Sequence, residues 1–156
     1  MKVFIIFLAL LVLNISFLCY WSDMDRYARM QNELKKLAEE CASGAALFRD
    51  EEAYSCGSLS IDATAAEAYL TFVLEKMQAR QPFSRSGAIA ARMEIFDDVK
   101  GYAGAEACGI FGGGPAVMVE LTWEGCDLFR LPLVCVETLK RSATYQWEGG
   151  LTSSLE

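Results

Sequence analysis

The chain contains no histidine among its 156 residues. Histidine is the usual general base near neutral pH and a ligand in most catalytic zinc sites, so its absence removes the Ser-His-Asp and Cys-His arrangements of many hydrolases. Asp62, Glu94 and Glu120 can be posed as an acid/base set, but nothing in the sequence brings them together. We therefore assign no catalytic residue, expect no cofactor and no metal ion, and interpret the chain as a non-enzyme.

Charge is also absent from residues 3–21, where the sequence reads VFIIFLALLVLNISFLCYW. As a helix this run would be roughly 28 Å long, close to the ~30 Å hydrocarbon core of a bilayer. It is longer than the apolar core of a secretory signal and lacks the small residues of a cleavage site at its end. Tyr20 and Trp21 are aromatic residues of the kind found at membrane interfaces. We interpret residues 1–21 as a transmembrane anchor that is retained rather than a signal that is removed.

Three side chains within this run carry a polar or reactive group. Asn14 and Ser16 are polar, and helices in lipid associate through packing and polar groups, so we expect these two residues to contact other membrane helices. Cys19 follows Leu18, which is too large for a lipoprotein site. Acylation at the interface is an alternative, but we interpret Cys19 as a thiol buried in the membrane.

The two sides of the anchor give opposing signals about orientation. More Lys and Arg residues follow the anchor than precede it, which alone would place the C-terminal side of the anchor in the cytoplasm. A signal-anchor with a leader of only Met1 and Lys2, however, usually translocates the domain on its C-terminal side. Five cysteines without metal-ligand spacing also fit an oxidising compartment. We therefore expect a single-pass protein of the cell membrane with an extracytoplasmic C-terminal domain.

The remainder of the chain is acidic. Residues 22–156 hold 13 Lys and Arg (14 less Lys2) against 21 Asp and Glu, a net charge of −8. This balance speaks against nucleic acid or an anionic membrane surface as a partner. A segment of this length is enough for one small domain with its own core.

The cysteines lack CxxC spacing, so structural disulfides are favoured over redox or zinc sites. One candidate pair is Cys41 with Cys56, whose loop of ~15 residues would contribute about 3 kcal/mol when closed. Among Cys108, Cys126 and Cys135 we expect one pair and one free thiol, and we favour Cys108 with Cys126.

No Gly or Pro separates the anchor from a stripe of helical period, so we expect one continuous helix. We assign residues 22–48 to an amphipathic stalk. The small residues at 41–46 permit close approach of another element, and core packing is favoured over a dimer seam. The stripe comprises Tyr27, Met30, Leu34, Leu37, Cys41, Ala45 and Phe48, of which the first four are the expected packing residues.

Residues 49–148 are predicted to form an extracytoplasmic α+β domain. After a polar turn region at 49–60, a second helix begins near Asp62 or Thr64 with a capping box between Thr64 and Glu67, and ends near Arg80. Alternation of period two then predicts a small antiparallel sheet. Its extended segments are residues 91–96, 117–123, 128–136 with a break at Pro132, and 139–147; residues 149–156 are expected to be disordered.

Two segments have a superficial likeness to binding motifs. Residues 109–115 (GIFGGGP) resemble a phosphate loop but lack Gly-Lys-Ser/Thr and lead into a strand, so we interpret them as a flexible connection. Asp97 and Asp98 could bind a cation, but two adjacent acids do not form a cage, and a turn is favoured.

Residues 25–42 (DRYARMQNELKKLAEECA) resemble the segment just past the membrane in TadE/TadG-like minor pseudopilins of tight-adherence pili, which are related to type IV pili and type II secretion. The ending, with Leu131-Pro132, residues 140–143 (KRSA) and residues 147–149 (WEG), also resembles the last strand of such proteins. Processed pseudopilins have a small residue at a peptidase site and a Glu early in the mature helix, and this chain has neither. The resemblance therefore implies a retained, TadG-like or accessory component with a pilin-like fold and no active site.

These observations lead to two hypotheses. In the first, the chain is a structural component of a Tad-type pilus or related secretion apparatus, with the lipid bilayer and other pilus or secretion subunits as its partners. In the second, it is a surface-anchored domain that binds a cell-envelope ligand. Neither hypothesis includes nucleic acid.

Overall fold

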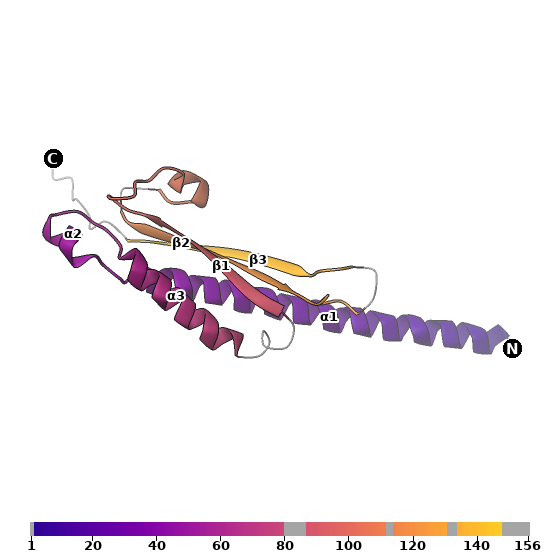
Figure 1. The fold of residues 1–156 in the computed structure, drawn as a ribbon. Coiled ribbons are helices and arrows are strands. Elements are labelled where there is room, and N and C mark those ends of the chain that lie inside the picture. Colours follow the sequence, from indigo (N-terminus) through magenta and orange to yellow (C-terminus); the bar gives the residue numbers. More distant parts are fainter. Residues whose placement is uncertain (1, 80–86, 112–113, 131–133, 148–156) are drawn as a thin grey trace.

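In the computed structural model, described here for residues 2–79, 87–111, 114–130 and 134–147, the first element is α1, a single helix of 44 residues, Lys2–Ala45 (Figure 1). The predicted continuous helix is confirmed. The helix ends beside Gly44, the first glycine in the chain, three residues before the predicted end of the stalk. Since no earlier Gly or Pro interrupts the backbone ladder, the apolar and amphipathic segments share one helix axis.

Two further helices follow, each with an aspartate at its N-cap. Asp50 caps the short helix α2, Glu51–Ser55, which lies within the predicted polar turn region. Asp62 caps α3, Ala63–Gln78, where its Oδ1 accepts the N–H groups of Thr64 at 2.9 Å and Ala65 at 3.2 Å. The predicted capping box is therefore wrong, because Asp62 rather than Thr64 satisfies the free donors of the first turn.

The sheet has three antiparallel strands in the order β1-β2-β3: Gly87–Phe96, Ala116–Gly125 and Thr138–Gln146. Met93 pairs with Val119, and Val119 with Ala143. The α+β prediction is confirmed. The described residues between 126 and 137 form a loop rather than the predicted extended segment; the break at Pro132, the end predicted at Arg80 and the tail 149–156 lie outside the described residues.

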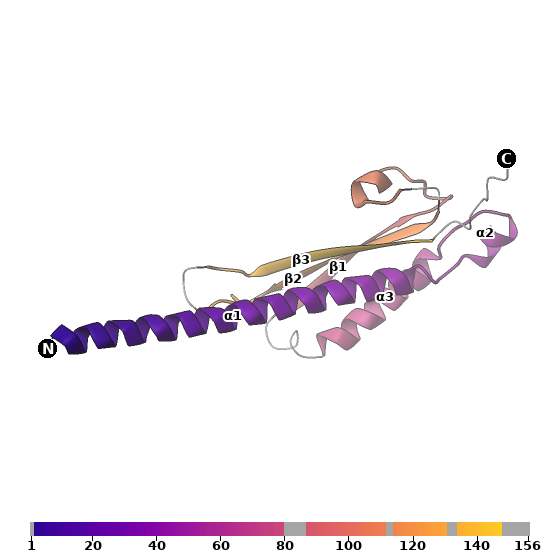
Figure 2. The same ribbon diagram turned by 180° about the vertical axis from the view of Figure 1, so that it is seen from behind.

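One face of the sheet is covered by helices, as Figures 1 and 2 show. α1 contacts β2, β3 and α3, while α3 contacts β1. The inward side chains of β2 are Val117, Val119, Leu121 and Trp123, all fully buried. The outer face is polar and carries ion pairs such as Lys140 with Glu120 at 3.7 Å. This division follows from the period-two alternation of the strands.

Asp97 stabilises a tight turn that follows the C-terminal end of β1. Asp97 accepts hydrogen bonds from Ser60 Oγ, the N–H of Ile61, and the N–H groups of Val99 and Lys100, at 2.7–3.2 Å. Burial acts to raise the pKa of Asp97, but these four hydrogen bonds outweigh it and hold the pKa below its ordinary value. Asp97 therefore has a structural role, as the prediction of a turn requires.

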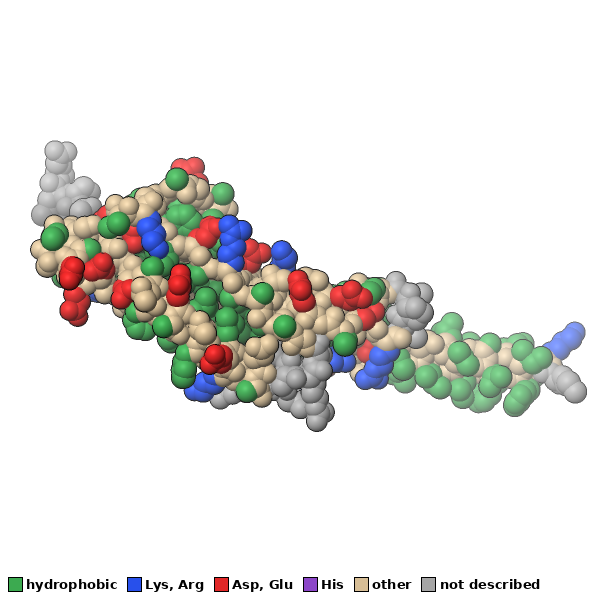
Figure 3. Space-filling view, viewed as in Figure 1, with side chains coloured by type: hydrophobic (Ala, Val, Ile, Leu, Met, Phe, Trp, Pro, Cys, Tyr) green, Lys and Arg blue, Asp and Glu red, His purple; other side chains and the backbone are tan. Residues whose placement is uncertain are grey.

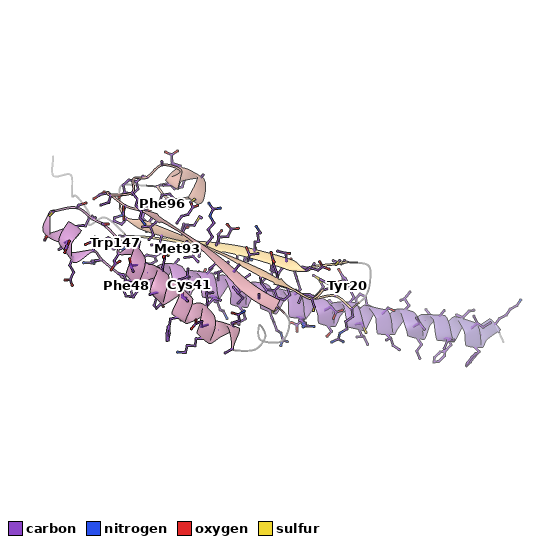
Figure 4. All side chains as sticks on the ribbon, viewed as in Figure 1. Tyr20, Cys41, Phe48, Met93, Phe96 and Trp147 are labelled. Atoms are coloured by element: carbon purple, nitrogen blue, oxygen red, sulfur yellow. The ribbon has the colours of Figure 1, made fainter. Side chains whose placement is uncertain are left out.

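A second, smaller cluster covers the outer face at this end of the sheet. It comprises Phe96, Ala105, Ile110 and Ala116, with a short 3-10 helix, Ala105–Cys108, above the strands. Figure 4 places Phe96 beneath this segment. The glycine-rich stretch leads from here into β2 after Pro115, so its described residues open no helix that could receive a phosphate.

Candidate functional site: the stem of α1 and its junction with the body

The N-terminal half of α1 is not covered by any other described part of the chain, except at its end, where Tyr20 meets Phe129. We call residues 2–22 the stem and the remainder of the protein the body. The large apolar side chains of the stem are exposed all round the helix. On the face seen in Figure 3 they appear as green groups along the stem, whereas the body carries mixed charges. Within the described residues, α1 is the one helix long and apolar enough to cross a membrane.

The two polar side chains of the stem differ in their surroundings. Ser16 Oγ donates a hydrogen bond to the carbonyl of Val12 at 2.9 Å, so its polar group is satisfied within its own helix. Asn14 is exposed, and its amide has no hydrogen-bond partner among the described residues. In hydrocarbon such an amide needs a partner from another molecule.

Where the stem meets the body, α1 carries a buried acid. The side chain of Asp23 is only 1% exposed. Its Oδ2 accepts the backbone N–H of Arg130 at 3.0 Å, and its Oδ1 lies 3.7 Å from Arg130 Nε without a hydrogen bond. A buried carboxylate is costly unless it is paired, so Arg130 makes this position tenable.

Aromatic packing surrounds this contact. The ring of Phe129 lies 6.0 Å, centroid to centroid, from the rings of both Tyr20 and Tyr27. These tilted geometries are favourable for aromatic pairs. We call Tyr20, Asp23, Tyr27, Phe129 and Arg130 the junction; Figure 4 places Tyr20 where the loop after β2 reaches α1.

Asp127 accepts hydrogen bonds from both described sides of the loop that supplies Phe129 and Arg130. Its Oδ1 accepts the N–H groups of Phe129 and Val136, both at 3.0 Å. These hydrogen bonds, from Val136 first, lower the pKa of Asp127. The Gly125 N–H also donates to the Glu137 carbonyl at 3.0 Å and closes the base of the loop. These hydrogen bonds join the described residues on the two sides of the loop, next to the junction.

Further contacts fix α1 along the rest of the sheet. Gln31 joins the helix to β3, because its amide nitrogen donates to Tyr27 Oη while its oxygen accepts from Arg141. At the far end, Trp147 Nε1 donates to the carbonyl of Ala46 at 2.8 Å. The guanidinium of Arg49 lies 5.1 Å from the Trp147 ring centroid, within cation–π range.

Close approach of α3 to α1 requires Gly44. A Cβ at this position would lie 2.3–2.4 Å from the ring of Tyr69, so only glycine leaves room for that ring. Figure 4 shows Phe48 near this end of the body, where its ring packs at 5.7 Å from Tyr69. The rotation of α1 is thus fixed relative to the body at both ends.

The four predicted packing residues lie on the body side of α1. Met30, Leu34 and Leu37 are fully buried in the main core, and Tyr27 is half-buried against it. Cys41 and Ala45 continue the same buried stripe. The small residues at 41–46 therefore pack within the core of this chain. This is the alternative that the sequence favoured over a dimer seam.

All six cysteines are free thiols in the structure, so neither the Cys41–Cys56 nor the Cys108–Cys126 pair is bonded. Both pairings remain predictions. Cys41 is buried, which together with the charge of Glu40 raises its pKa to about 11. Cys56 and Cys126 are exposed, and Cys108 is half-buried.

The acids considered as a catalytic set have separate structural roles. Asp62 caps α3, Glu94 pairs with Arg92 at 2.5 Å, and Glu120 pairs with Lys140. No group of three or more His, Cys, Asp or Glu side chains suited to a metal ion occurs within the described ranges. A hollow of about 920 Å³ runs along the polar face of α1. Its charged residues include an ion pair between Arg29 and Asp25 at 2.6 Å.

The junction was not predicted from the sequence. The burial of Asp23 was not predicted, although this residue precedes Tyr27 and Met30 by four and seven residues and so lies on their stripe. That spacing was the available signal for its burial. No local sequence pattern identified Arg130 as the partner of Asp23, because the two residues are 107 positions apart.

No protein-family model matches the chain, and no curated protein or solved structure matches it either.

Proposed function

We propose that the chain is a non-enzymatic, membrane-anchored structural component of a Tad-type pilus or related secretion apparatus. One observation carries this proposal: α1 is a single helix whose first half is bare and apolar while its second half forms part of the body's core. Such a helix holds a folded domain at a membrane surface and leaves the stem free for lateral contacts.

The rigidity of the junction supports this role. Asp23, Phe129 and Arg130 fix the rotation of α1 relative to the sheet immediately beyond the apolar segment. A lateral contact made by the stem therefore sets the direction in which the body's surfaces face. This coupling is what an assembly subunit needs, whereas a simple tether needs only an anchor.

The resemblance of residues 25–42 to TadE/TadG-like pseudopilins supplies the assignment to a pilus system. The charged residues of that segment lie on the exposed side of α1, and Met30, Leu34 and Leu37 lie in the core. Under this proposal the body lies outside the cytoplasm and contacts other subunits there.

The test of lateral contact is chemical crosslinking in native membranes that contain the full chain. Asn14→Leu removes the unpartnered amide, and we expect it to reduce the crosslinks to partner subunits while the body stays folded. Ser16→Ala is the matched control, because Ser16 already bonds within its own helix, and it should leave the crosslinks unchanged. Equal crosslinking of Asn14→Leu and the unaltered chain would count against the proposal.

The identity of the crosslinked partners distinguishes the two function hypotheses. Pilus or secretion subunits support the structural role. Recovery of the chain alone, together with a saccharide or peptide ligand, would instead support a surface-anchored binding domain and contradict assembly.

Topology is tested with a membrane-impermeant maleimide applied to intact cells after mild reduction. If the body is outside, Cys56 and Cys126, which are exposed, label without lysis. Cys41 should remain unlabelled until the protein is denatured, because it is buried in the core, and so serves as the internal control. Labelling of Cys56 only after lysis would place the body in the cytoplasm.

A further inference from the structure

We propose that the stem binds the stem of a second copy of this chain in a parallel pair, with the two Asn14 amides hydrogen-bonded to each other. This inference rests on the proposed function in one respect, since it requires the stem to lie in a bilayer. It goes further by naming the partner and the contact face.

The contact face is defined by its spacing. Phe7, Leu11, Asn14, Leu18 and Trp21 follow one another at alternating intervals of four and three residues, which is the seam spacing of two supercoiled helices. All five are exposed. We call them the seam. A surface hollow of about 490 Å³ runs along it, and both Asn14 and Leu11 line this hollow.

The seam lies on the side of α1 that faces away from the body. Asp23, which is buried at the junction, follows Asn14 by nine residues, or about two and a half helical turns, and so points in the opposite direction. Asn32 follows Asn14 by eighteen residues, or about five full turns, and it is exposed. Figures 1 and 2 show the sheet on one side of α1. A partner on the seam therefore lies on the side of α1 opposite the described residues of the body.

Asn14 specifies which partner fits. All copies of a single-pass chain cross the membrane in the same direction, so neighbouring copies bring Asn14 to the same depth. An amide carries both a donor and an acceptor, so two Asn14 side chains satisfy each other without a further polar group. A single Asn within an apolar seam also fixes the register of two helices. An unrelated helix would need a polar residue at this same depth.

The test uses the purified full chain reconstituted in phosphatidylcholine vesicles at a range of protein-to-lipid ratios. A photo-crosslinking residue at position 11 samples the seam, and the same residue at position 13 samples another side of the stem. We expect dimeric product from position 11 and little from position 13. Leu13 is apolar like Leu11 and is the more exposed of the two, at 67% against 42%, so a low yield from position 13 would not reflect burial of that position.

Substitution of Asn14 then tests the amide itself. Asn14→Leu should weaken dimerisation by about tenfold, as expected for one interhelical hydrogen bond in lipid. Asn14→Gln keeps the amide and should restore most of the dimer, and Ser16→Ala should leave it unchanged.

Each remaining outcome overturns the inference or the proposed function. A monomer at every protein-to-lipid ratio, or equal products from positions 11 and 13, would contradict a specific seam. Capture of a different membrane protein through Asn14, without homodimers, would exclude the second copy yet support the proposed function. Dimers in vesicles, without any crosslinked subunit in native membranes, would support this inference while the proposed function fails.

Discussion

The two halves of α1 belong to one helix but present different surfaces. Residues 2–22 are predominantly apolar on every side and, among the described residues, touch the body only where Tyr20 packs on Phe129. Residues 23–45 instead bury one stripe and expose polar residues on the other side. A helix that is apolar all round needs an apolar medium, and an amphipathic helix needs a core on one side only. The change from one surface to the other within a turn of Asp23 is compatible with a boundary between lipid and water at this point.

Each half also makes a separate contribution to the molecule. The body half stabilises the folded state, because its buried side chains fill the core beneath the sheet. Among the described residues the stem half adds no buried side chain to that core and meets it only through Tyr20, so most of its sequence is free to meet the demands of the membrane and of neighbouring helices. Matched substitutions in the two halves test this division of roles.

The largest contrast is expected between two leucines of α1. Leu34 is fully buried, so Leu34→Ala should lower the free energy of unfolding of the body by about 3 kcal/mol through lost burial and a residual cavity. Leu11→Ala in the stem should change it by less than about 0.5 kcal/mol. Urea unfolding in detergent micelles measures both, and equal losses would contradict the separation of the two halves.

The next contrast lies at the boundary itself. Asp23→Ala leaves the Arg130 N–H without its buried acceptor and should cost about 2 kcal/mol. Asp25→Ala removes an acid two residues away that is half exposed and pairs with Arg29 on the surface, and it should cost far less. Hydrogen exchange at the Arg130 amide gives an independent readout. Unchanged protection of this amide in Asp23→Ala would show that the junction is not held by Asp23.

A third comparison uses pH. Burial holds the pKa of Cys41 at about 11, above the ordinary value of 9.0, so the folded protein retains a proton that the unfolded chain loses. Stability from this group is therefore present below pH 9 and is lost as the pH rises towards 11. The unaltered chain should lose about 1 kcal/mol more than Cys41→Ala by pH 10. Parallel pH profiles for the two proteins would contradict burial of this thiol.

The smallest effect is expected on the exposed side of the body half. Arg29 pairs with Asp25 at 2.6 Å, but its side chain is largely exposed. Arg29→Ala should therefore change the free energy of unfolding by at most about 0.5 kcal/mol, and raised salt should reduce even that. A loss comparable with that of Asp23→Ala would show that this side of α1 packs against something.

The parts of the fold that the sequence predicted were those with a strong local period. Met30, Leu34 and Leu37 repeat at helical spacing, and the inward residues of β2 alternate from Val117 to Trp123, so α1 and the central strand could be assigned from the residues alone. The first strand was placed too short, beginning at Ala91 instead of Gly87. Ala88 and Ala90 are weak strand formers whose conformation is set by pairing with β2.

Features that depend on distant residues were not predictable in this way. The burial of Asp23 requires Phe129 and Arg130, which come from the loop between β2 and β3. The capping of α3 is local, but the sequence offered two polar groups, Asp62 and Thr64, and did not show which of them reaches the first turn. Asn14 was identified from its polarity within the apolar run. Its direction relative to the body, on which the seam depends, required the position of the sheet around α1.

The central claim is that the stem holds the folded body permanently at a bilayer. The direct measurement is fractionation of cells that contain the full chain, with alkaline carbonate extraction of the membranes. The account predicts that the intact chain stays in the membrane pellet after extraction and leaves it only with detergent. Recovery of the intact chain as a freely soluble protein would contradict the account.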